Sequence, residues 1–157
     1  MKSVEVLTEQ FRARGLKVTP QRQSIFRALS SSTAHPTAEA VYAAVSADMP
    51  TISLRTVYQT LNDLTAMGEL STLDVGTGST RFDPNLDPHH HLVCESCGRI
   101  EDLHVEFPGV AVPTTDEARG FEVTATQIVF RGSCATCASA AAQSNNTNQT
   151  TRGDVHA

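Results

Sequence analysis

Residues 53–83 have the sequence SLRTVYQTLNDLTAMGELSTLDVGTGSTRFD, and two successive patterns within it decide the fold. In the first pattern apolar residues recur at helical spacing and form one face. That face consists of Val57, Leu61 and Leu64. Ser53 is a typical N-cap and Gly68 a typical left-handed stop. The pattern predicts an amphipathic helix from Ser53 to Met67-Gly68.

Beyond this helix the period changes from helical to alternating, which is typical of strands. Residues 69–75 and 79–82 form two short alternating runs, and Gly76-Thr77-Gly78 between them supplies a turn. A helix followed by such a hairpin is the arrangement of a winged helix. We therefore expect an α+β protein whose first domain, residues 1–83, is a winged helix.

Three further helices are predicted upstream of residue 53. The first ends near Gly15, and the second begins at Thr19-Pro20 and ends at about Ser30. The third begins at His35-Pro36-Thr37 and ends near Met49-Pro50, because the residue before proline disfavours helix. These helices supply the remainder of an N-terminal helical core.

One face of the predicted 53–68 helix is polar and suited to DNA. Arg55, Tyr58, Gln59 and Asn62 share it. Arginine and glutamine can make bidentate contacts with base edges, and a tyrosine ring can pack on a thymine methyl group. The alternative interpretation is a plain solvated helix face, but the adjoining wing favours the interpretation as a DNA-binding face.

Charge is distributed unevenly along the 157 residues, whose formal net charge is −5. Residues 1–82 hold 8 Lys/Arg against 7 Asp/Glu, and residues 83–157 hold 4 against 10. Residues 1–27 alone have six basic and two acidic side chains, which could face phosphates or simply form a solvated surface. The predicted DNA contacts are Lys17, Arg22, Arg55, Thr56, Tyr58 and Gln59.

Length and hydropathy exclude several classes of protein. The chain is too short for a large multidomain enzyme, and no apolar run approaches the roughly 20 residues that span a bilayer. The start MKSVEVLTEQFRARG lacks the apolar core of a signal peptide. We expect a cytoplasmic protein with no membrane partner.

The second half is predicted to be a smaller α/β domain. Residues 84–88 are rich in turn formers and mark a hinge, residues 89–137 form the domain, and residues 138–157 have little to bury and are expected to be disordered. Short strands are predicted at 91–94, 99–105, 121–126 and 127–130, with a weak helix near 115–119.

Four cysteines occur as two Cys-x-x-Cys pairs, Cys94/Cys97 and Cys134/Cys137. Four thiolates complete a tetrahedron, and a closed four-sulfur shell is typical of structural zinc because it leaves no open position for substrate. A dithiol redox site is the competing interpretation, but one pair would suffice for it. The sequence thus favours a structural Zn(II) site.

A second group of potential ligands surrounds His89-His90-His91. Alternation along a strand sends His89 and His91 to one side and His90 to the other. With His35, Asp83 and Asp102 they form a mixed nitrogen and oxygen set, which suits Fe(II) or Mn(II) and leaves one position open. His35 by itself is a lone loop histidine that would be expected in solvent, and its inclusion in this set rests on the family resemblance described below.

The order of several motifs carries a family resemblance across residues 4–137. These motifs are Thr19-Pro20-Gln21-Arg22, His35-Pro36-Thr37-Ala38, Thr56-Val57-Tyr58, Arg81-Phe82-Asp83, His89 to Gly98, and Cys134-x-x-Cys137. In them the chain resembles the ferric uptake regulator family of bacterial repressors. The resemblance implies a homodimer, with a winged-helix domain and an α/β dimerisation domain, that binds palindromic AT-rich double-stranded DNA operators.

The resemblance also assigns the two metal sites. It implies structural zinc at Cys94, Cys97, Cys134 and Cys137, and a regulatory metal at His35, Asp83, His89, His91 and Asp102. With Asp102 the chain resembles the peroxide-sensing branch of the family, because iron-uptake regulators usually carry glutamate at this ligand position. In that branch peroxide and Fe(II) oxidise a ligand imidazole, expected here at His35 or His89, and the operator is released.

Two alternatives remain open at the level of sequence. An iron-responsive uptake repressor would respond to metal occupancy and not to ligand oxidation. A thiol oxidoreductase or zinc enzyme would need a catalytic base and an open zinc position, and neither is apparent in the sequence. We therefore predict a non-enzymatic, metal-dependent repressor.

Overall fold

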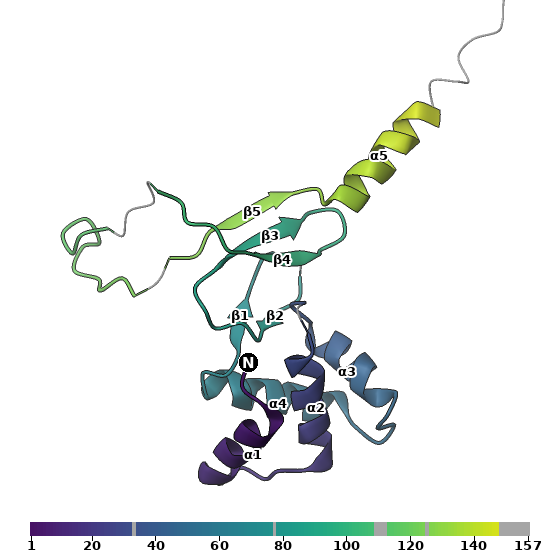
Figure 1. Ribbon diagram of the computed structural model, residues 1–157, viewed down its shortest axis with the longest axis vertical. Helices are drawn as coiled ribbons and strands as arrows, with labels where there is room; N and C mark the ends of the chain where they lie inside the picture. The colour runs from purple at the N-terminus through teal and green to yellow at the C-terminus, as the bar shows by residue number, and fades with distance from the viewer. Residues whose placement is uncertain (33, 77, 109–112, 125, 148–157) are drawn as a thin grey trace, which may run out of the picture. The chain divides into compact units, whose positions relative to one another are not determined.

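The computed structural model describes residues 1–32, 34–76, 78–108, 113–124 and 126–147. The chain divides into two compact units, Met1–Asp87 and Pro88–Ala157. Four helices and a two-stranded sheet form the first unit, and a three-stranded sheet followed by a helix forms the second (Figure 1). The mixed α+β class expected from the sequence is confirmed.

The helices of the first unit begin where the sequence places their caps. They are α1 (Val4–Ala13), α2 (Pro20–Ser30), α3 (Ala38–Ser46) and α4 (Leu54–Ala66). The side chains of Ser3, Thr19, Thr37 and Ser53 each accept a backbone N–H of the first turn. Gly68, with φ of 73°, terminates α4 in the left-handed conformation that glycine adopts without strain.

A single hydrophobic core holds these helices together. The predicted apolar face of α4 is fully buried in it, and Phe11 of α1 packs on Phe26 of α2 with ring centroids 4.9 Å apart. Strands β1 (Ser71–Leu73) and β2 (Arg81–Asp83) pair antiparallel as the predicted wing. Thr77, which the sequence predicts in the turn of this hairpin, lies outside the described residues.

The second unit contains a sheet with strand order β4-β3-β5. Strand β3 (His90–Cys94) is central, antiparallel to β4 (Ile100–Leu103) and parallel to β5 (Val129–Gly132). The sheet brings the ends of β3 and β5 together, with one cysteine pair beginning at the last residue of β3 and the other lying just beyond β5. None of the helices in the described parts of the chain is long and apolar enough to cross a membrane.

Two local expectations for the second unit are wrong. The segment near 115–119 is a turn, because Arg119 and Gly120 take positive φ values of 53° and 86° after a single helical turn. Thr114 and Glu117 bond to each other as in a helix N-terminus, yet no helix follows. Residues 121–124 and 126 are not in a strand, so of the two predicted strands only the second is present, as β5.

The expected disorder from residue 138 also needs correction. Helix α5 (Ala135–Thr147) continues through the first part of that segment. Its sequence ATCASAAAQSNNT is rich in alanine, which has the highest helix propensity, and the turn at Cys134 starts the helix. Residues 148–157 lie outside the described residues.

Candidate metal centres and DNA-contacting surface

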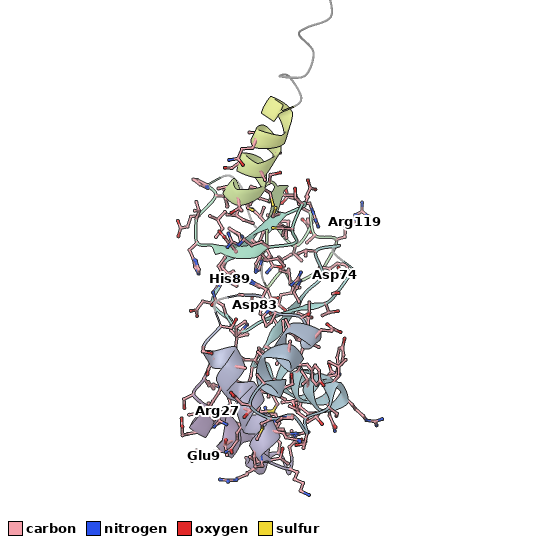
Figure 2. All side chains as sticks on the ribbon, turned by 90° about the vertical axis from the view of Figure 1, so that its right-hand side faces the viewer. Glu9, Arg27, Asp74, Asp83, His89 and Arg119 are labelled. Atoms are coloured by element: carbon pink, nitrogen blue, oxygen red, sulfur yellow. The ribbon has the colours of Figure 1, made fainter. Side chains whose placement is uncertain are left out.

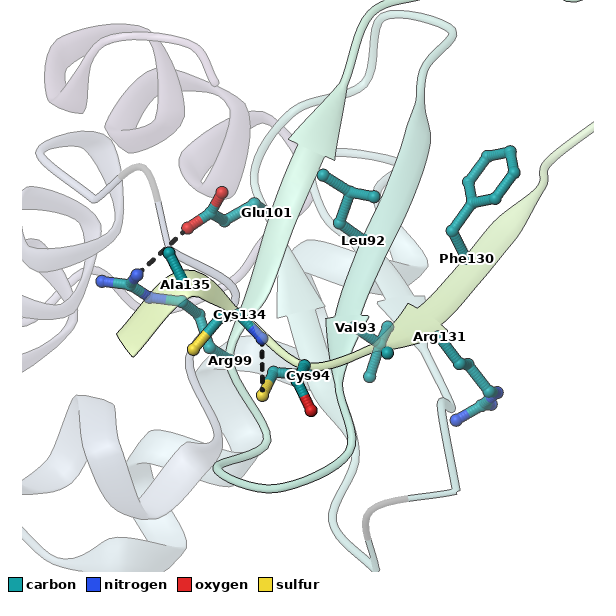
Figure 3. A pocket seen from close by; sticks show the side chains of 11 residues that line it. Leu92, Val93, Cys94, Arg99, Glu101, Phe130, Arg131, Cys134 and Ala135 are labelled. Atoms are coloured by element: carbon teal, nitrogen blue, oxygen red, sulfur yellow. Dashed lines mark hydrogen bonds and ion pairs between the residues drawn. The ribbon is translucent and has the colours of Figure 1, made fainter. Parts of the chain in front are cut away.

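The four cysteines form one cluster within the second unit. Their Sγ atoms all lie within 4.8 Å of one another, and those of Cys97 and Cys134 are 3.9 Å apart. Cys94 ends β3, and the turn after it closes with the Gly98 N–H donating to the Cys94 carbonyl. Figure 3 shows Cys94 and Cys134 at adjacent ends of the sheet.

Backbone groups prepare this cluster for a cation. The Cys134 N–H donates to Cys94 Sγ at 3.3 Å, and this bond, with a second from the Cys97 N–H, lowers the pKa of Cys94 to about 6. Hydrogen bonding to the sulfurs of Cys134 and Cys97 raises the pKa of Cys137 to about 12. Four thiolates cannot coexist there at neutral pH without a compensating positive charge.

Zinc fits this donor set. A Zn–S distance of about 2.3 Å requires tetrahedral sulfurs roughly 3.8 Å apart, close to the spacing that the cluster already has. All four sulfurs are used in the shell, so no ligand position is left for a substrate. The cluster is a structural zinc site, as the cysteine spacing predicts.

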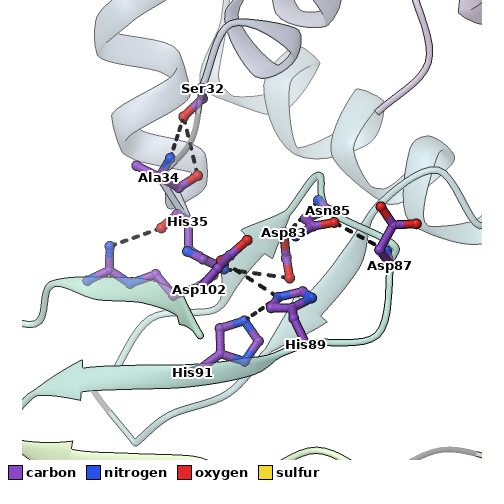
Figure 4. A network of polar contacts seen from close by, with 10 residues as sticks. Ser32, Ala34, His35, Asp83, Asn85, Asp87, His89, His91 and Asp102 are labelled. Atoms are coloured by element: carbon purple, nitrogen blue, oxygen red, sulfur yellow. Dashed lines mark hydrogen bonds and ion pairs between the residues drawn. The ribbon is translucent and has the colours of Figure 1, made fainter. Parts of the chain in front are cut away.

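A second set of donors occurs in the first unit, beside β2. His35 Nε2 lies 3.6 Å from Asp83 Oδ2, and both side chains are buried (Figure 4). Strand β2 holds the loop that carries His35: the Phe82 N–H donates to the Pro36 carbonyl, and the Arg81 guanidinium donates to the His35 carbonyl. The burial of His35 corrects the solvent-exposed position that the sequence alone suggests.

The matching donors of the second unit lie at the start of β3. His89 Nε2 is 3.0 Å from His91 Nε2 and 3.6 Å from Asp102 Oδ1 on β4 (Figure 4). His90 points elsewhere and accepts the Ile128 N–H through Nδ1, as strand alternation requires. His104, which the sequence analysis does not single out, stacks on His89 with ring centroids 5.6 Å apart.

The polar face predicted on α4 is exposed in the structure. Arg55, Tyr58 and Gln59 are exposed, and Thr56 is half-buried with its hydroxyl 2.9 Å from that of Ser53. The Tyr58 hydroxyl donates to Glu39 Oε1 of α3 at 2.6 Å. No sequence signal identifies Glu39, because the two residues lie 19 positions apart on different helices and no periodicity links them.

The two basic residues predicted upstream have different environments. Lys17 is exposed in the loop between α1 and α2. Arg22 is buried: its Nη2 lies 2.8 Å from Asp63 Oδ2, and its guanidinium lies 5.2 Å from the centre of the Phe11 ring. Arg22 therefore packs within the unit, whereas the sequence analysis places it on an exposed basic surface. Arg27, labelled in Figure 2, is the exposed arginine of the same helix.

Taken together, a winged helix with an exposed polar recognition face and a structural zinc site define a metal-containing DNA-binding regulator. Comparison of the chain with models of protein families gives a narrower class. The model of the ferric uptake regulator family matches residues 13–131. The chain belongs to this family. It is thus a metal-responsive, DNA-binding repressor, and regulators of this family act as dimers.

Individual relatives point in the same direction. The chain is 40% identical over 130 residues to the peroxide-responsive repressor PerR of Staphylococcus aureus, covering 80% of this chain and 85% of the relative. The structure of PerR from Streptococcus pyogenes has a TM-score of 0.51 at 27% identity, over 87% and 94% of the two chains. The ferric uptake regulator Fur of Helicobacter pylori shares the fold, with a TM-score of 0.68 at 21% identity over 88% and 97%.

Proposed function

We propose that this chain is a metal-dependent transcriptional repressor that senses hydrogen peroxide through Fe(II)-catalysed oxidation of a ligand histidine. One observation carries the proposal: each unit holds its own part of a mixed donor set. The first contributes His35 and Asp83, 3.6 Å apart, and the second contributes His89, His91 and Asp102. The similarity to peroxide-responsive repressors supports the choice of signal.

One regulatory ion would be held by all five of these residues. Neither unit has enough ligands to fill a metal shell, so an ion that binds both stabilises one arrangement of the units over others. That arrangement would set the spacing of the two recognition helices of a homodimer on a double-stranded DNA operator, for which we propose a palindromic AT-rich sequence. The residues from Pro84 to Pro88 would be the hinge.

The donor chemistry favours Fe(II) or Mn(II) for this site. Three imidazoles and two carboxylates suit these ions better than the thiolate-rich shells that zinc occupies, and five ligands leave one position for an exogenous molecule. Fe(II) bound there would supply one-electron chemistry that activates peroxide beside the ligand imidazoles. Mn(II) would support DNA binding without this reactivity.

The proposed modification is an oxygen transfer to His35 or His89. A ring C–H of the imidazole becomes C–OH, the O–O bond of hydrogen peroxide breaks, and the second oxygen leaves as water. The histidine loses two electrons and the peroxide gains them. An oxidised ring is a poorer ligand, so the metal is released and the two units lose their common tether.

The test compares two loaded forms of the full-length protein. A duplex that Mn(II)-loaded protein selects from a randomised library serves as the DNA probe. After a brief exposure to hydrogen peroxide, the Fe(II) form is expected to release this duplex and to gain one oxygen mass on the peptide with His35 or with His89. The Mn(II) form is expected to stay bound and unmodified.

Cysteine oxidation is the competing account of peroxide release. It would eject zinc from Cys94, Cys97, Cys134 and Cys137 whichever regulatory metal is present. If release follows zinc loss and both histidine peptides stay unmodified, the peroxide-sensing function is refuted. An iron-occupancy regulator, which releases DNA only when iron is withdrawn, then becomes the better assignment.

A further inference from the structure

The hydrogen bond between Tyr58 and Glu39 joins α4 to α3, the helix before it, on an exposed surface. The donor, Tyr58, is in the second turn of α4, and the acceptor, Glu39, is in the first turn of α3. The bond is short, at 2.6 Å, and Tyr58 remains 41% exposed. The ring is therefore accessible to a ligand while its hydroxyl is already engaged.

The carboxylate of Glu39 is unfavourable if the exposed face of α4 binds DNA, which is itself negatively charged. The hydrogen bond from Tyr58 holds the pKa of Glu39 below its usual range, so the side chain is negatively charged at neutral pH. An exposed negative charge beside a recognition helix repels phosphates and weakens binding to every sequence. Besides its capping contacts with its own backbone and Thr37, Glu39 contacts Tyr58, and this contact links it to the exposed face of α4.

We propose that Glu39 is a positioning residue that determines specificity by controlling what Tyr58 offers to DNA. This inference rests on the proposed DNA-binding function. A phenol has one O–H hydrogen and oxygen lone pairs. Glu39 takes the hydrogen and fixes the ring, so Tyr58 presents an apolar ring and an oxygen acceptor, but no donor.

This restriction selects between kinds of contact. Thymine offers a methyl group to the ring, and adenine and cytosine offer amino groups that can donate to the phenol oxygen. Phosphate oxygens and the O6 and N7 atoms of guanine are acceptors only, and Tyr58 cannot donate to them while Glu39 holds its hydrogen. A tyrosine that would otherwise bind any phosphate thus becomes a base-selective contact.

Three variants separate positioning from charge. Glu39→Gln removes the charge but keeps an oxygen that accepts the Tyr58 hydrogen, whereas Glu39→Ala removes both. Tyr58→Phe removes the hydroxyl and keeps the ring. Full-length protein loaded with Mn(II) is used to select from a randomised duplex library, and affinities are then measured for the wild-type consensus and for random DNA.

We expect Glu39→Ala and Tyr58→Phe each to reduce the ratio of consensus to random affinity about tenfold, which corresponds to one base contact. Glu39→Gln should keep that ratio within about twofold. The double variant Glu39→Ala/Tyr58→Phe should lose no more than Tyr58→Phe alone, because both changes remove the same hydrogen bond.

Glu5→Ala is the matched control for charge and helix stability. Glu5 is also an exposed acid in the first turn of a helix, and its pKa is lowered by backbone and Ser3 hydrogen bonds and not by a contact with the recognition helix. The Glu5 variant should leave the affinity ratio unchanged. A loss of the ratio in Glu39→Ala but not in Glu5→Ala therefore supports positioning.

Two results would overturn the inference, and they are distinguishable. If Glu39→Ala and Glu39→Gln both tighten binding to all DNA and leave the ratio intact, Glu39 acts as a charge alone. If Mn(II)-loaded wild-type protein enriches no sequence, the proposed DNA-binding function fails and this inference fails with it.

Discussion

The two units of the chain differ in what stabilises them. The hydrophobic core cluster lies entirely within Met1–Asp87, where helices α1 to α4 bury large aliphatic and aromatic side chains. In the described part of Pro88–Ala157, the buried hydrophobic side chains are Val93, Cys94 and Ile100. Within a single chain, this apolar burial offsets only a small part of the entropy lost when the sheet is ordered.

The comparison explains why the zinc site belongs to the second unit. Zinc bound to four thiolates contributes folding free energy directly, in place of a core. Cys94 ends β3 and Cys97 follows it, while Cys134 and Cys137 lie beyond β5 at the start of α5, so a bound ion would tie the ends of the parallel strands β3 and β5 together. One unit is thus stabilised by burial and the other by coordination, and each should fail under a different perturbation.

The largest expected effect is loss of the zinc site. Cys94→Ser should release zinc and unfold the second unit, since structural zinc supplies roughly 10–16 kcal/mol of binding free energy in small domains. Metal analysis and amide NMR of the full-length protein would measure it. Ser96→Ala, in the same turn, should retain both zinc and fold. Dispersed spectra for residues beyond 90 in the zinc-free variant would show that the second unit does not depend on metal coordination for its fold.

The reciprocal perturbation is a cavity in the core of the first unit. Phe26→Ala should destabilise that unit by about 3–5 kcal/mol, because it removes a fully buried ring that packs on Phe11. Urea denaturation followed by helical circular dichroism reports the loss, while the zinc content should stay at the wild-type level. Zinc release in parallel with helix loss would show that the two units do not fail separately.

Sequence patterns predicted the first unit closely because its determinants are local. Caps such as Thr19 and Ser53, the stop at Gly68 and the apolar face of α4 each lie within a few residues of what they control. The secondary structure of the second unit was predicted less accurately. At 114–120 a capping pair predicts a helix, but Arg119 and Gly120 end it after one turn.

The candidate sites show the same division between local and long-range information. Spacing found the cysteine cluster and the convergence of His89 and His91, because two-residue alternation and Cys-x-x-Cys turns are local geometry. It could not find the Arg22–Asp63 pair, which joins α2 and α4 across 41 positions and depends on how the helices pack. Arg22 was consequently expected on the DNA surface.

The Arg22–Asp63 pair gives the next smaller effect. Arg22→Ala should cost about 2 kcal/mol of stability, between the values typical of exposed and buried pairs, because it removes the ion pair and the packing on Phe11. Arg27→Ala is the matched control, being an exposed arginine of the same helix, and should change the stability by less than about 0.5 kcal/mol. Equal thermal stabilities for the two variants would show that the contacts of Arg22 with Asp63 and Phe11 do not stabilise the unit.

The smallest effect is expected at Lys17, where the question is binding and not stability. Lys17 is exposed on the first unit, so Lys17→Ala should leave the melting temperature unchanged. If its ammonium contacts a phosphate, the variant binds consensus and random DNA more weakly by the same factor, and the slope of log K against log salt falls by about 0.9 per lost contact. Arg55→Ala, on the α4 face, should instead lose consensus binding preferentially, by roughly 1–3 kcal/mol. Identical salt slopes for wild type and Lys17→Ala would show that the loop between α1 and α2 does not contact the DNA backbone.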